Sequence, residues 1–66
     1  MDKNVIALRL ARVRESKGIS APALSHRIGR AHNYINSIET GKRSMNIEAL
    51  LLICKELGIS PKELFD

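Results

Sequence analysis

Aromatic residues are scarce in this sequence. They make up 3% of its 66 residues and include no tryptophan, whereas 44% of the residues are apolar, chiefly leucine, isoleucine and alanine. β-Sheets are enriched in aromatic and β-branched residues, and leucine and alanine are good helix formers. The composition therefore favours an all-α fold. The length predicts a single domain over residues 1–66, with little room for a deep catalytic cleft.

Cysteine and long apolar runs are also lacking. Cys54 is the only cysteine, so no disulfide can form within the chain and no cysteine pair can begin a zinc site. No apolar run has the length of a signal peptide or the roughly 20 residues that cross a bilayer. We therefore expect a cytoplasmic protein with no membrane contact and no bound metal. The sequence indicates neither a cofactor nor a small-molecule ligand.

Positive charge is unevenly distributed along the chain. The net charge is +4, but residues 1–43 carry nine Lys and Arg against three Asp and Glu (+6), and residues 44–66 carry two against four (−2). Phosphates are bound by clustered Lys and Arg rather than by overall charge. The distribution fits a polyanion-binding surface, and it equally fits an ordinary solvated surface.

Apolar residues recur at helical spacing near the N-terminus. Ile6, Leu10 and Val13 lie at i, i+4 and i+7 and predict one face of a helix over residues 3–16. Gly18 ends this helix, because glycine is the usual residue just past a helix C-terminus.

Two short helices follow, separated by a tight turn at residues 29–31. Ser20 can cap the first helix, with Pro22 in its first turn, where the missing N–H has no intrahelical partner. The second helix is expected near residues 32–39. The apolar residues of the pair are Leu24, Ile28, Tyr34, Ile35 and Ile38. Helices joined by so short a link cannot lie antiparallel.

The rest of the chain predicts a basic loop and two more helices. We expect the backbone N–H groups of residues 41–44 to be free to meet an anion. Asn46 can cap a fourth helix. Its buried face is predicted to carry Ile47, Leu50, Leu51, Cys54 and Leu57. A capping box at residues 60–63 opens a last helix, whose Leu64 and Phe65 are expected to fold onto the core.

The two short helices carry a further pattern of small and turn residues. Ser25 lets two helix backbones approach, and Gly29 supplies the left-handed geometry of a sharp turn. Ile38-Glu39-Thr40-Gly41-Lys42-Arg43 and residues 47–51 complete it. In this joint spacing the sequence resembles the helix-turn-helix domain of the phage lambda repressor and Cro-like family, also called the xenobiotic response element family. The resemblance implies a five-helix lambda repressor-like fold in which helices 2 and 3 form the helix-turn-helix.

The resemblance also implies that the third helix reads bases in the major groove of double-stranded DNA. His32, Asn33, Asn36 and Ser37 occupy the base-reading positions. These side chains are polar and uncharged at neutral pH, which suits hydrogen bonding to base edges, and asparagine pairs well with adenine. The alternative is a polar helix face that is simply solvated.

Further residues match positions that usually meet DNA phosphates. These are Thr40, Lys42 and Arg43, and the hydroxyl of Tyr34 can also reach a phosphate. The family usually has a phosphate-contacting glutamine where this chain has Ala21. Arg30 stands where the family usually has an apolar residue, and it either replaces the lost phosphate contact or is an ordinary surface arginine.

Two more expectations concern structure and assembly. By resemblance, Arg14 and Glu39 form a partly buried ion pair between helix 1 and the end of helix 3. Leu8, Met45 and Leu52 fall away from the predicted buried faces and are expected to be exposed. They either form a dimer or partner surface or are scattered apolar residues of the kind that most surfaces carry.

The function that the resemblance implies is transcriptional regulation on the nucleoid. We expect repression by a homodimer on a near-palindromic operator, with half-sites roughly 34 Å apart. The setting can be a phage Cro-type repressor, a restriction-modification controller or an antitoxin-like autoregulator. The alternative is a protein-binding adaptor that uses the same fold without DNA contact.

Enzyme activity is not expected. A catalytic site built from Ser25, His26 and Glu39 would lack an oxyanion loop and a substrate pocket, so we assign no catalytic residues. His26 has no evident metal partner. Cys54 is interpreted as a small core residue rather than a redox site.

Overall fold

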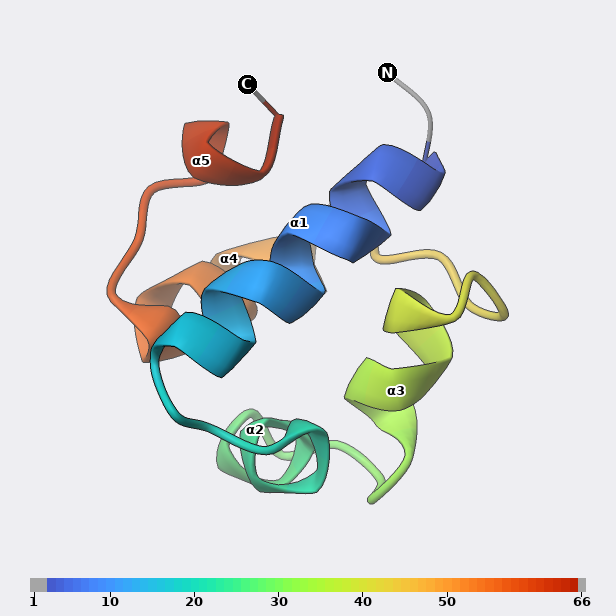
Figure 1. Ribbon diagram of the computed structural model, residues 1–66. Coiled ribbons are helices and arrows are strands. Elements are labelled where there is room, and N and C mark those ends of the chain that lie inside the picture. Colours follow the sequence, from blue (N-terminus) through green and yellow to red (C-terminus); the bar gives the residue numbers. More distant parts are fainter. Residues whose placement is uncertain (1–2, 66) are drawn as a thin grey trace.

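Residues 3–65, which this computed structural model describes, form five helices and no strand (Figure 1). The helices are α1 (Lys3–Ser16), α2 (Ala21–Arg27), α3 (Tyr34–Glu39), α4 (Ile47–Leu57) and α5 (Lys62–Phe65). The predicted all-α, five-helix fold is confirmed. The third helix begins at Tyr34 rather than near His32, because residues 32–33 belong to a turn closed by a hydrogen bond from the Tyr34 N–H to the Ala31 carbonyl.

Side-chain caps fix the starts of α2 and α4. The Ser20 hydroxyl oxygen accepts a hydrogen bond from the Ala23 N–H at 3.1 Å, and Asn46 Oδ1 accepts one from the Ala49 N–H at 2.8 Å. Each cap satisfies a backbone donor that has no partner within its helix, and such a cap typically stabilises a protein by about 1 kcal/mol. Both caps agree with the prediction.

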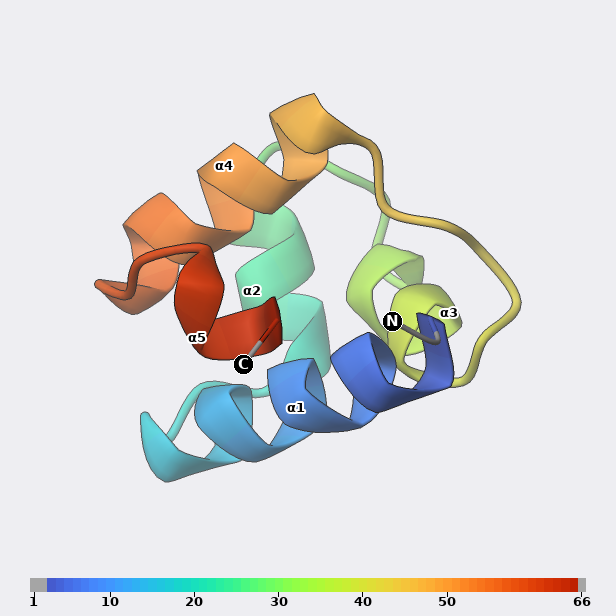
Figure 2. The ribbon, with the colours of Figure 1, turned by 90° about the horizontal axis from the view of Figure 1, so that it is seen from above.

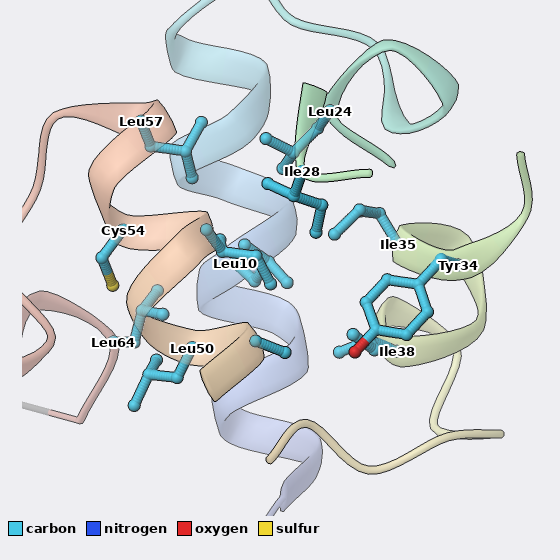
Figure 3. Packing of buried hydrophobic residues seen from close by; sticks show 12 residues of the cluster. Leu10, Leu24, Ile28, Tyr34, Ile35, Ile38, Leu50, Cys54, Leu57 and Leu64 are labelled. Atoms are coloured by element: carbon cyan, nitrogen blue, oxygen red, sulfur yellow. The ribbon is translucent and has the colours of Figure 1, made fainter. Parts of the chain in front are cut away.

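The core lies where all five helices meet. Its largest fully buried apolar side chains are Leu10, Leu24, Ile35, Ile53 and Leu64, one from each helix. Figure 3 labels four of them, all except Ile53. In Figure 1, α5 lies above α1 and α4, and α2 lies below them; seen from above, α3 lies to one side (Figure 2). Cys54 is also buried in this core, and burial raises the pKa of its thiol. This position agrees with a packing role.

The buried face of α4 differs from the predicted one. It consists of Ala49, Leu50, Ile53, Cys54 and Leu57. Contrary to the prediction, Ile47 and Leu51 are 70% and 54% exposed. Leu52 and Met45, predicted to be exposed, pack against the core instead. Apolar residues occupy nearly every position from 47 to 54, so their spacing does not single out one face.

The C-terminal helix contributes one of its two apolar residues to the core. Leu64 is fully buried, but Phe65 is 37% exposed, so the expected burial is correct only for Leu64. The Ser60 N–H donates a hydrogen bond to the Glu63 carboxylate at 2.9 Å, which is one half of the predicted capping box.

Candidate nucleic-acid interface

A buried hydroxyl joins α2 to α3. Ser25 is fully buried, and its hydroxyl donates a hydrogen bond to the Ala21 carbonyl while its oxygen accepts one from the Ile35 N–H, both at 2.9 Å. The small side chain lets the two helices approach, as predicted from the sequence. The hydroxyl adds a role that the sequence pattern did not reveal, since it satisfies a backbone donor near the start of α3.

The candidate base-reading residues gather around the N-terminal end of α3. His32 and Asn33 are exposed in the turn before the helix, and Asn36 is exposed in its first turn. Ser37 is only partly exposed, and its hydroxyl donates a hydrogen bond to the Asn33 carbonyl at 2.9 Å. Exposed asparagine amides offer both donors and acceptors. Three of the four candidates therefore present polar groups to solvent, and the hydroxyl proton of Ser37 is already used.

In the loop after α3, three of the four backbone donors predicted to be free are already bonded. The N–H groups of Lys42 and Arg43 donate to the Ser37 carbonyl at 2.9 and 3.1 Å, and that of Gly41 donates to the Ile38 carbonyl at 3.1 Å. Gly41 has a φ of 79°, and this left-handed residue lets the chain fold back over the helix end in a Schellman motif. An anion at this loop would therefore be held mainly by side chains.

The side chains around this loop are available to solvent. Lys42 and Arg43 are exposed, and so is Thr40, whose hydroxyl donates to the Asn36 carbonyl at 2.9 Å. The hydroxyl oxygen of Thr40 retains acceptor capacity, but its proton is engaged. Lys42 and Arg43 are therefore the strongest candidates here for binding an anion.

Tyr34 supports two arginines instead of facing solvent. Its side chain is buried, and the guanidinium carbons of Arg30 and Arg43 lie 5.6 and 5.2 Å from the centroid of its ring. Both distances are within the range of cation–π attraction. Arg30 also makes an ion pair, with its Nη2 lying 3.1 Å from Oε1 of Glu48. The sequence pattern did not reveal this partner, because the two residues are 18 positions apart and belong to different elements.

The ion pair expected between Arg14 and Glu39 is present. Arg14 Nε and Nη2 donate to the two carboxylate oxygens of Glu39 at 2.7 and 3.0 Å, and Arg14 Nη1 donates to the Ile19 carbonyl at 2.8 Å. The side chains of the pair are 13% and 9% exposed. The hydrogen bond to Glu39 raises the pKa of Arg14 above its ordinary value. Arg14 thus ties α1 to α3 and to the segment before α2.

Neither a cluster of metal ligands nor a membrane-spanning helix occurs within residues 3–65. No group of three or more histidine, cysteine, aspartate or glutamate side chains within this range is placed to hold a metal ion. No helix in it is long and apolar enough to cross a membrane.

Comparison with known sequences places the chain in a family. A sequence profile of the family HTH_3, described as helix-turn-helix, matches residues 10–64. The chain belongs to this helix-turn-helix family. The match begins within α1 and extends into α5, so it covers nearly all of the described fold. The resemblance to lambda repressor and Cro-like proteins is therefore confirmed.

Relatives of this helix-turn-helix protein include both curated sequences and solved structures. The uncharacterized HTH-type transcriptional regulator y4dJ of Sinorhizobium fredii is 29% identical over 62 residues, which cover 94% of this chain and 80% of the relative. The restriction-modification controller C.AhdI of Aeromonas hydrophila is 31% identical over 97% of each chain, with a TM-score of 0.90. The biofilm master regulator SinR, solved in complex with DNA, is 31% identical over 92% of this chain and 98% of that chain, with a TM-score of 0.83.

Proposed function

We propose that this helix-turn-helix protein is a transcriptional regulator that binds double-stranded DNA through α3 and the loop that follows it. The observation that carries the proposal is the two-sided character of α3. Its apolar residues Tyr34, Ile35 and Ile38 are buried, and polar side chains are exposed at its N-terminal end. A basic loop adjoins its other end. Relatives that are transcription regulators, one of them solved with DNA, support the same function.

The proposed contacts divide into base reading and phosphate binding. His32, Asn33 and Asn36 reach base edges, with Ser37 contributing an acceptor. Thr40, Lys42 and Arg43 meet phosphates through their side chains, because their own N–H groups are already bonded. Tyr34 acts by supporting arginines rather than through a contact of its own. Phosphate contacts position such a protein, and base contacts specify its site.

Selection of bound duplexes from a random pool tests this function. A recovered consensus, titrated beside a scrambled duplex at several salt concentrations, should bind more tightly than the scrambled one. Affinity for both should fall steeply with salt, since bound phosphates release counterions. No binding to either duplex at low salt would refute DNA binding and favour the protein-binding adaptor, whose apolar contacts salt would not weaken.

We also propose that the protein is a repressor that acts as a homodimer on a near-palindromic operator. Half-sites about 34 Å apart would match the two-fold symmetry of such a dimer. A regulator works where the DNA is, so we expect it on the nucleoid in the cytoplasm. Among the settings, a restriction-modification controller is supported by C.AhdI and by C.Esp1396I, which is 27% identical with a TM-score of 0.84. Neighbouring genes for a restriction enzyme and a methyltransferase would agree with this setting.

The proposed dimer surface is an apolar groove of about 250 Å³ beside the start of α4. Its apolar lining consists of Ile6, Ala7, Ile38, Met45, Ile47, Leu50 and Phe65. Ile47 is 70% exposed at this groove, so each protomer carries both an apolar projection and a hollow. A two-fold contact is self-complementary, and a second copy can therefore seat its Ile47 in the groove of the first. Of the three residues that the sequence predicted for a dimer surface, Met45 lines this groove, Leu8 lies outside it, and Leu52 packs against the core.

Sedimentation of charged variants tests the dimer surface. Ile47→Glu should reduce the measured mass from that of a dimer to that of a monomer. Leu8→Glu is the matched comparison, because Leu8 is also exposed, at 52%, but lies outside the groove. If Leu8→Glu alone dissociates the dimer, the surface lies on α1. If neither variant does, the proposal is wrong.

A further inference from the structure

Arg30 is the charged residue on the candidate interface whose role the proposed function leaves open. It lies in the turn between α2 and α3, and its guanidinium has two partners. Nη2 is 3.1 Å from the carboxylate of Glu48 in the first turn of α4, and the guanidinium carbon is 5.6 Å from the centroid of the Tyr34 ring. Its side chain is 30% exposed. The guanidinium is therefore oriented, reachable from solvent and already paired with an anion.

Arg43, which lies in the loop after α3, contacts the same tyrosine ring. Its guanidinium carbon is 5.2 Å from the Tyr34 centroid, and within residues 3–65 it has no ion pair. The turn before α3 and the loop after it thus bring two positive charges to one tyrosine. With Glu48 included, the cluster has two positive charges and one negative charge, a net charge of +1. Without the charge of Glu48 it would be +2.

We propose that Glu48 is an internal competitor for DNA phosphate. Its carboxylate occupies the place on Arg30 that a phosphate oxygen would take, and so weakens binding to every duplex regardless of sequence. This inference rests on the proposed DNA-binding function. Arginine forms the same charge-assisted hydrogen bonds with carboxylates as with phosphates, so the two anions compete for one guanidinium.

The exposure of the pair makes the competition reversible. The Glu48 side chain is 75% exposed, and ion pairs of this kind contribute little to stability and are screened by salt. A phosphate can therefore displace the carboxylate, but the displaced charge stays nearby and repels the phosphate. An arginine that is already neutralised also adds little to counterion release, so Glu48 should reduce the salt dependence of binding.

Tyr34 gives the Arg30 guanidinium a second, uncharged partner. Its ring holds the Arg30 guanidinium independently of Glu48, so removing the carboxylate charge leaves the arginine in place. The freed charge would then stay at the ring that Arg43 also contacts, where it is available to a phosphate. Removing a negative charge should thus create a contact rather than a disordered side chain.

Four proteins test the proposal: wild type, Glu48→Gln, Arg30→Ala and the double variant. Glu56→Gln is the matched control, because Glu56 is exposed on the same helix and has no ion pair within the described chain. It removes the same net charge without freeing an arginine. Each protein is titrated against the selected operator and against a scrambled duplex at several salt concentrations.

Glu48→Gln should bind both duplexes about three- to tenfold more tightly than Glu56→Gln at low salt, as expected for removing one nearby like charge. Its salt slope should be steeper by about one unit. Arg30→Ala should bind both duplexes more weakly than wild type, because it leaves the Glu48 charge uncompensated, and the double variant should bind no more tightly than wild type.

Equal affinities of Glu48→Gln and Glu56→Gln would overturn the proposal while leaving DNA binding intact. A gain that persists without Arg30 would also overturn it, because the effect would then arise elsewhere. If wild type binds no duplex at low salt, the DNA-binding function itself is refuted, and the inference fails with it.

Discussion

Removing the carboxylate charge of Glu39 should severely destabilise the protein. Arg14 and Glu39 share two hydrogen bonds of 2.7 and 3.0 Å, and their side chains are 13% and 9% exposed. Glu39→Gln would strand a largely buried guanidinium, which typically costs about 3 to 5 kcal/mol. Arg14 would keep its bond to the Ile19 carbonyl, and the new amide oxygen can accept one bond, so we expect the lower end, about 3 kcal/mol. Total stability at this length is about 3 to 10 kcal/mol.

Urea denaturation followed by far-ultraviolet circular dichroism measures this loss. With a slope near 1 kcal/mol/M, the midpoint should fall by roughly 3 M. Glu15→Gln is the matched control, since Glu15 also contacts Arg14, at 4.0 Å, but is 69% exposed. Its loss should be under about 1 kcal/mol. A Glu39→Gln loss as small as that of Glu15→Gln would refute the argument that burial makes this pair important.

Three further predictions concern DNA reading, the helix junction and the buried thiol. Asn36→Ala should cost about 1 to 3 kcal/mol of binding free energy on the selected operator and much less on a scrambled duplex. Lys42→Ala should weaken binding to both duplexes alike and lower the salt slope by about one unit. Equal losses on both duplexes for Asn36→Ala would show that Asn36 does not read a base. Ser25→Ala should cost about 1 to 3 kcal/mol in denaturation, because it leaves the buried Ile35 N–H without its partner, and an unchanged midpoint would contradict this. Burial raises the pKa of the Cys54 thiol in the folded state, so the stabilisation it contributes is present below the unfolded pKa and is lost as pH rises through the folded pKa. Alkylation of Cys54 at neutral pH should proceed only as fast as the folded protein opens to expose the thiol. Labelling of the folded protein as fast as in urea would contradict the burial of this thiol.

The elements that the sequence predicts well are those with local signals. Ser20 and Asn46 cap helices because a short polar side chain three residues before a backbone donor reaches it directly. The ion pair of Arg14 and Glu39 was accessible only through the family resemblance, since 25 residues separate the two partners. Spacing failed on α4, where apolar residues at nearly every position are compatible with several faces, and the tertiary fold selects one.

The candidate interface was predicted in its side chains but not in its internal bonds. The sequence did contain a signal for the hydrogen-bonded N–H groups of the loop. A glycine just after a helix end, here Gly41, is typical of a Schellman motif, in which these N–H groups donate to carbonyls of the helix. The pairing of Arg30 with Glu48 had none. It depends on how the turn before α3 meets the start of α4, and no periodic pattern records such a contact between distant segments.

The buried hydroxyl of Ser25 has a consequence for how new operator preferences can arise. Because it bonds to α2 and to the start of α3 at once, we expect the two helices to move as one unit in the proposed DNA complex. The exposed side chains of His32, Asn33 and Asn36 can then be substituted without moving the helices, and each substitution should alter the preference at the base that the side chain is proposed to contact. A substitution at Ser25 would instead change the angle between α2 and α3, so that every proposed base contact is misaligned together. Substitutions that change the DNA target are therefore expected at the exposed positions of the protein, while residue 25 stays small and keeps a hydroxyl group.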